Sequence, residues 1–277
     1  MNHPTALDGA LQLRRLPVFG QLYAQMAQEA QATPVSYEGY LLALAEQELA
    51  HRQRIRQQLY LKLARFPVRK AFADFDFRLV PSLNQARVRT LAEGHSIRPA
   101  EPILMVGHPG LRKSHLATAL GVAACQQGQR VRFSNAAGFV NDLLVAQETH
   151  RVPQFIATAL KQHVVILDEL GFIPFSDRGT QLIFQFCSAL HERVALIVTT
   201  NLRFADWTQV FGNPSLTAAL LDRLTAHAHI LEFVGDSYRL RQHPTRRTPT
   251  AAERPAAAPA AAPALLGNIS AETGVAP

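Results

Sequence analysis

The sequence predicts an α/β protein: a five-stranded parallel sheet covered by helices on both faces and preceded by a small helical domain. Between residues 82 and 243, apolar runs of strand length alternate with longer helical patterns. One run enters a Gly- and Pro-containing loop that closes on Lys-Ser, and another ends in two acids. The expected strands are Ile103–Val106, Val131–Ser134, Val164–Asp168, Leu196–Thr200 and Ile230–Phe233.

The loop after the first expected strand follows the phosphate-binding pattern G-x-x-x-x-G-K-[ST], except that Arg112 replaces the second glycine. Such a loop and the helix after it direct backbone N–H groups at phosphate. Lys113 would then reach the β- and γ-phosphates, and Ser114 would bind Mg²⁺. Arg112 is either an extra phosphate contact or an obstruction that narrows the pocket. The alternative is an ordinary strand–turn–helix.

Polar residues end two further expected strands. Asp168 is expected to hold Mg²⁺ through water, and Glu169 to polarise the attacking water. The strand that ends at Asn201 lies between the loop strand and the acidic strand in NTPases with an additional strand, which would direct Asn201 at the γ-phosphate. Either polar end is also compatible with a plain strand-to-turn transition.

Arg223 follows in a helix-like stretch. It is a candidate arginine finger for a neighbouring subunit's nucleotide, or a surface arginine beside Asp222.

Several of these segments together resemble the IstB-like ATP-binding proteins, which are AAA+ helper ATPases of insertion sequences and are similar to the helicase loader DnaC. The resemblance runs from about Leu11 to Gln242 and is carried by Gly107–His115, Leu167–Pro174, Thr199–Leu202, Phe204–Phe211 and Leu220–Leu224. The family's loop reads Gly-Pro-Pro-Gly-Thr-Gly-Lys-Thr. The matching nucleotide-binding positions here are Gly107, His108, Pro109, Gly110, Leu111, Arg112, Lys113, Ser114 and His115, of which His108, Leu111 and Arg112 depart from it.

The resemblance implies a transposition helper that binds ATP and Mg²⁺, assembles as a homo-oligomer on double-stranded DNA, contacts a transposase and is reset by hydrolysis. Catalytic roles would fall to Lys113, Asp168, Glu169, Asn201 and Arg223, and Arg239 would be a second-sensor arginine. Two alternatives stay open: an assembly factor whose hydrolysis is impaired by Arg112, and a DnaC-like helicase loader.

The chain divides into four expected regions. Residues 1–70 form a helical basic domain, 71–81 a linker, 82–243 the AAA+ domain and 244–277 a disordered Ala/Pro-rich tail. In the linker, Phe72, Phe75 and Phe77 are expected to pack on the ATPase core rather than beside adenine. The candidate DNA-binding residues are Arg52, Arg54, Arg56, Lys62 and Arg65. A solvated helix face is the alternative.

Composition agrees with this organisation. The net charge of +7 favours a polyanionic partner. The two cysteines, Cys125 and Cys187, show no disulfide or metal-ligand spacing, which favours the cytoplasm. We found neither a signal sequence nor an apolar run of membrane-spanning length, so no membrane association is expected.

Overall fold

The computed structural model describes residues 3–33 and 35–235, which belong to one compact unit. Its sheet has five strands, all parallel, in the order β2-β3-β4-β1-β5. The strands are β1 (Ile103–Gly107), β2 (Val131–Asn135), β3 (Val164–Leu170), β4 (Ala195–Thr200) and β5 (His229–Phe233). The predicted fold class is therefore confirmed, including the place of β4 between β1 and β3.

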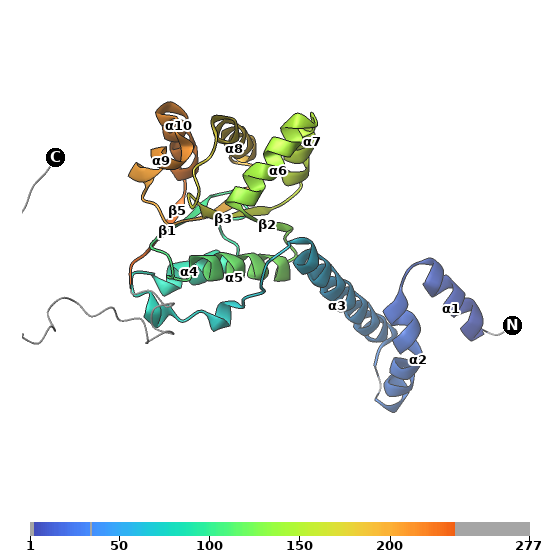
Figure 1. The fold of residues 1–277 in the computed structure, drawn as a ribbon. Coiled ribbons are helices and arrows are strands. Elements are labelled where there is room, and N and C mark those ends of the chain that lie inside the picture. The colour runs from blue at the N-terminus through green and yellow to red at the C-terminus, as the bar shows by residue number, and fades with distance from the viewer. Residues whose placement is uncertain (1–2, 34, 236–277) are drawn as a thin grey trace, which may run out of the picture. The chain divides into compact units, whose positions relative to one another are not determined.

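Helices cover both faces of the sheet. In chain order, the α-helices of the described residues are α1 (His3–Leu13), α2 (Pro17–Ala32), α3 (Tyr37–Leu63), α4 (Gln85–Ala92), α5 (Lys113–Gln126), α6 (Ala136–Glu148), α7 (Val152–Ala159), α8 (Asp177–Leu190), α9 (Thr208–Phe211) and α10 (Pro214–Thr225). Helices α4 and α5 lie on one face, and α6 to α10 lie on the other (Figure 1). The arrangement is the doubly wound α/β sandwich that alternating strands and helices predict.

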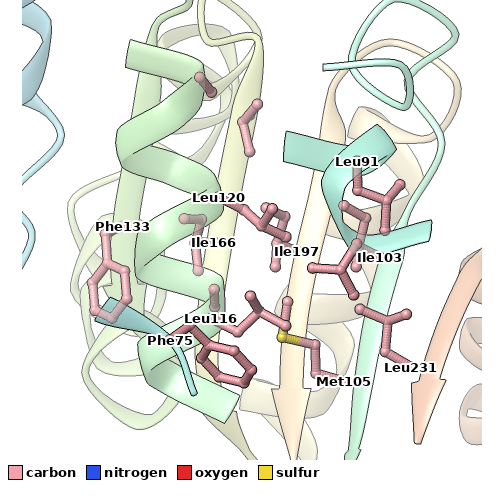
Figure 2. Close-up of a cluster of buried hydrophobic side chains, with 14 of the residues drawn as sticks. Phe75, Leu91, Ile103, Met105, Leu116, Leu120, Phe133, Ile166, Ile197 and Leu231 are labelled. Carbon is pink, nitrogen blue, oxygen red and sulfur yellow. The ribbon is translucent and has the colours of Figure 1, made fainter. Parts of the chain in front are cut away.

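Side chains that alternate along β1 explain the two layers of core. Ile103 and Met105 pack with Leu116 and Leu120 of α5 (Figure 2), whereas Leu104 packs in the cluster on the opposite face. All five are at most 4% exposed. Since both faces of a central parallel strand are covered, its sequence is continuously apolar rather than alternating.

The N-terminal helices are joined by a buried acid. Helix α3 begins after Ser36, whose side chain accepts a hydrogen bond from Gly39 N–H at 3.1 Å, as its sequence predicts. Further along α3, Glu48 is 4% exposed. Its carboxylate accepts hydrogen bonds from Val18 N–H of α2 at 3.0 Å and from Arg52 at 2.7 Å. The hydrogen bond from Val18 thus fastens α2 to α3, and the ion pair with Arg52 compensates the charge of Glu48 within α3.

The carboxyl end of α3 packs on the α/β core. The Ala64 carbonyl accepts a hydrogen bond from Phe133 N–H of β2 at 2.8 Å. The three linker phenylalanines follow, with Phe75 buried in the α5-side core and Phe72 and Phe77 packed against it. The expectation that they pin the linker to the core is met.

The Ala/Pro-rich tail and Arg239 lie outside the described residues. Within the described ranges, no helix is both long enough and apolar enough to cross a membrane. Cys125 and Cys187 lie in α5 and α8 and are buried.

Candidate nucleotide-binding site

The predicted loop, the end of β3 and the end of β4 surround one cavity at the carboxyl edge of the sheet. This cavity has a volume of about 260 Å³. It is lined by Pro109, Gly110, Arg112, Lys113, Ser114, His115, Glu169, Phe172, Thr199, Thr200 and Asn201. Residues far apart in the sequence therefore meet where open α/β sheets bind their ligands.

Two glycines in the loop occupy positions that a side chain would disturb. At Gly107, where φ is +152°, a Cβ would lie 2.3 Å from the Phe233 carbonyl oxygen of β5. At Gly110, φ is +85°. Both values lie in the region that glycine tolerates best, so the backbone favours glycine at both positions.

Arg112 adopts a backbone conformation that favours glycine. Its φ of +63° and ψ of +25° are left-handed, and it is the residue that immediately precedes α5. Its side chain is partly exposed and lines the cavity. The departure from the motif therefore places a bulky residue in a left-handed conformation and adds a cation at the cavity wall. Leu111, by contrast, is 2% exposed and belongs to the core.

Lys113 lies inside the loop that precedes it. Its ammonium donates hydrogen bonds to the carbonyl oxygens of Gly107 at 2.5 Å and His108 at 2.8 Å. Lys113 as a whole is 9% exposed. Ser114 follows in the first turn of α5 and also lines the cavity. The first turn of α5 thus brings a cation, a hydroxyl and the N–H groups of a helix N-terminus to one place.

The two acids lie at an irregularity between β3 and β4. The register of these strands shifts between Leu167 and Leu170, and Glu169 has a φ of +59°. At this register shift, the Thr199 side chain of β4 takes the place of the regular backbone pairing. Its hydroxyl donates a hydrogen bond to Asp168 Oδ1 at 2.5 Å and accepts one from Glu169 N–H at 2.9 Å. A β-bulge of this kind redirects side chains. Here Glu169 lines the cavity, while Asp168 is 7% exposed beside it.

Glu169 has a second partner that the sequence reasoning missed. Asn135, the last residue of β2, donates from Nδ2 to Glu169 Oε2 at 2.9 Å. Asn135 is in register with Asp168 on the neighbouring strand. A polar residue that ends an adjacent parallel strand was the signal that could have revealed it.

His115 is enclosed between the cavity and the linker. Its ring makes an edge contact with Phe75, with centroids 5.6 Å apart. Burial lowers its pKa from the usual value, and the positive charge of Arg112 lowers that pKa further. Both effects favour the neutral form of the His115 imidazole.

The remaining catalytic candidates differ in position. Asn201 directly follows β4 and lines the cavity. Arg223 lies on α10, where its guanidinium carbon is 4.9 Å from the Phe184 ring centroid and its Nη1 donates to the Ala219 carbonyl at 3.2 Å. It does not line this cavity. Its action on a neighbouring subunit stays a prediction.

The candidate DNA-binding residues are not equivalent. Arg54, Arg56 and Lys62 lie on α3 and Arg65 lies just after it, and all four are exposed. Arg52 instead pairs with Glu48 and donates from Nη2 to the Arg15 carbonyl at 2.7 Å. Arg52 therefore has a structural role within the N-terminal helices.

The loop, the helix N-terminus, the lysine and the acidic strand end together define a P-loop nucleotide-binding protein. Residues 8–246 match the family model described as IstB-like ATP binding protein. The chain belongs to this family, so ATP binding and an origin in insertion sequences are family properties that it shares.

Curated relatives agree with this assignment. The chain is 34% identical to a protein of Geobacillus stearothermophilus named for ATP binding in insertion sequence IS5376, over 82% of this chain and 90% of that protein. It is 33% identical to a Pseudomonas aeruginosa protein named for ATP binding in insertion sequence IS21, over 78% and 82% of the respective chains.

The chain is also similar to the crystal structure of the DnaC helicase loader, with 22% identity, a TM-score of 0.48 and coverage of 55% of this chain and 90% of that one.

Proposed function

We propose that this protein is an ATP-dependent helper of transposition that assembles on double-stranded DNA as a homo-oligomer, acts with a transposase and hydrolyses ATP. The observation that carries the proposal is the cavity in which Lys113, Ser114, Glu169 and Asn201 meet. Family membership supports the ATP and the insertion-sequence context. Its expected place of action is the cytoplasm.

Each residue of the cavity has a distinct role in this proposal. The N–H groups at the start of α5 bind phosphate oxygens, and Lys113 exchanges its two carbonyl partners for the β- and γ-phosphates. Ser114 directly and Asp168 through water would hold Mg²⁺, which would neutralise phosphate charge. Glu169, oriented by its hydrogen bond from Asn135, accepts the proton of the attacking water. Asn201 positions that water.

Three variants test the nucleotide site. Lys113→Ala should abolish measurable ATP binding, whereas Glu169→Gln should retain ATP and lose turnover. Lys161→Ala, at an exposed lysine outside the cavity, is the control and should keep both properties. Titration calorimetry measures binding, and phosphate release with and without DNA measures turnover. Normal ATP binding by Lys113→Ala would refute the assignment of the cavity.

DNA binding is proposed for the exposed cations of α3. No acid occurs between Ala50 and Ala73, so neighbouring side chains on this segment do not cancel their field. Because each phosphate contact contributes a slope of about −0.9 in log affinity against log salt, the double variant Arg54→Glu/Arg56→Glu should reduce the slope by about 2.

The matched control for DNA binding is Arg193→Glu, an exposed arginine before β4. Arg52 is left intact because it holds Glu48. Fluorescence anisotropy with a labelled duplex at several salt concentrations gives both slopes. An unchanged slope in the double variant would place the DNA surface elsewhere.

A second candidate function is a nucleotide-binding assembly factor with slow hydrolysis. The favouring observation is Arg112, which adds a cation at the cavity wall. If the guanidinium holds the nucleotide unproductively, Arg112→Gly should raise kcat while ATP affinity falls. Equal turnover in the two proteins would argue against this candidate.

A further inference from the structure

A second and larger cavity lies beside the edge strand β2. This feature, the β2-edge groove, has a volume of about 750 Å³ and is bounded by the carboxyl end of α3, β2, α6 and α7. It shares no lining residue with the nucleotide cavity. Arg130 and Val131, where β2 begins, and Gln162, just before β3, belong to its lining. The groove therefore lies toward the amino ends of the strands, whereas nucleotide is expected at their carboxyl ends.

The floor of the β2-edge groove is apolar. Phe139 contacts Phe155 and Phe186 edge to face, with ring centroids 5.4 and 4.6 Å apart. Val145 of α6 is 59% exposed at the groove. The volume falls in the range of about 300–1,000 Å³ that is typical of ligand pockets. Apolar side chains of a ligand would be desolvated here.

The polar lining of the groove is strongly basic. Arg65, Arg130, Arg132 and Arg151 face a single acid, Asp142. Arg130 donates from Nε to the Lys161 carbonyl. Arg132 is half-buried, and within residues 3–33 and 35–235 its guanidinium makes no hydrogen bond or ion pair. Burial lowers the Arg132 pKa, the charge of Arg65 lowers it further, and the charge of Asp142 offsets part of this effect. A half-buried cation without a hydrogen-bond acceptor, beside more arginines than acids, is a feature that an anionic ligand would complete.

We propose that the β2-edge groove binds a short acidic peptide segment of a partner protein, with apolar side chains on its aromatic floor and carboxylates on Arg132 and Arg151. A guanidinium binds a carboxylate through two parallel hydrogen bonds. An apolar floor beneath such cations matches a peptide that alternates acidic and apolar side chains. This binding surface goes beyond the proposed nucleotide function and does not require it.

Nucleic acid fits the groove less well. A DNA duplex would place phosphates on the arginines but leave the apolar floor without a partner. Single strands bind by stacking bases on exposed aromatic faces. Phe139 and Phe186 are 5% and 0% exposed, and their rings are covered by one another. Phe139 and Phe186 therefore offer apolar contact but no open ring face on which a base could stack.

The test uses the full chain with ATP and an array of 12-residue peptides in which acidic and apolar positions are varied independently. A fluorescein-labelled copy of the strongest acidic–apolar peptide is then titrated by anisotropy. The groove variants are Arg132→Gln and Val145→Glu. Their matched controls are Arg193→Gln and Val35→Glu, at exposed positions outside the groove.

Both groove variants should raise the peptide Kd at least tenfold, and neither control should change it by more than twofold. Val145→Glu changes an exposed residue, so it decides the question even if Arg132→Gln impairs folding, which thermal unfolding would reveal. ATP affinity should be equal in all five proteins. The proposal is overturned if no acidic–apolar peptide is retained, if binding ignores both variants, or if both weaken binding of a labelled DNA duplex instead.

Discussion

The left-handed backbone of Arg112 allows a direct test of whether the loop is held in a strained conformation. A non-glycine residue in this region is disfavoured by about 1–2 kcal/mol. Glycine relieves that strain but loses about 0.5–1 kcal/mol through the entropy of the unfolded chain. Arg112→Gly should therefore be more stable than Arg112→Ala by about 0.5–1 kcal/mol. Because both variants lack the guanidinium, the difference between their free energies of unfolding reports only the backbone contribution at this position.

Urea unfolding followed by circular dichroism measures this difference, with the nucleotide omitted so that binding does not contribute. At most sites in a helix, alanine would be the more stable of the two by a similar amount. The sign of the difference is therefore diagnostic. If Arg112→Ala matched or exceeded Arg112→Gly in stability, the left-handed conformation of this residue in the folded protein would be refuted.

Three other predictions follow from contacts in the structure. Arg52→Ala should lower the free energy of unfolding in urea titrations by about 2 kcal/mol, because it leaves the carboxylate of buried Glu48 with one partner fewer. Replacing another exposed arginine of α3 by alanine should lower it by less than about 0.5 kcal/mol. Asn135→Ala should lower the kcat for ATP hydrolysis about tenfold without changing ATP affinity, because it removes one hydrogen bond that orients the Glu169 carboxylate. An equal loss of ATP affinity would contradict this positioning role. The pKa of His115 is lowered in the folded protein, so the unfolded chain binds the proton more readily. The free energy of unfolding should therefore fall as the pH drops below about 6.5, and it should fall less in His115→Gln. Identical pH profiles of the two proteins in thermal melts would show that His115 makes no such contribution.

The sequence was sufficient for the sheet and for the edge at which the chemistry gathers. Runs such as residues 164–167 are apolar because β3 is buried on both faces, and the polar residue that follows each run marks the strand's carboxyl end. Lys113, Glu169 and Asn201 could therefore be assigned to one edge from the sequence, and they do line one cavity there. The order of residue types along the chain does not show which residues of neighbouring strands lie side by side. For this reason Asn135, the partner of Glu169, was missed.

The same limit explains why the sequence did not reveal the backbone conformation of Arg112, which the fold does show. Whether a residue can take a left-handed conformation depends on what holds the residues on either side. Leu111 is 2% exposed and Leu116 is fully buried, so both flanks of Arg112 are fixed in the α5-side core. Burial of each leucine contributes about 1.5–3 kcal/mol, which together exceeds the strain of about 1–2 kcal/mol at one residue. The core thus imposes a left-handed conformation on a residue that would otherwise avoid it. The glycine that precedes the lysine in the motif is therefore a preference of the backbone rather than a requirement of the fold.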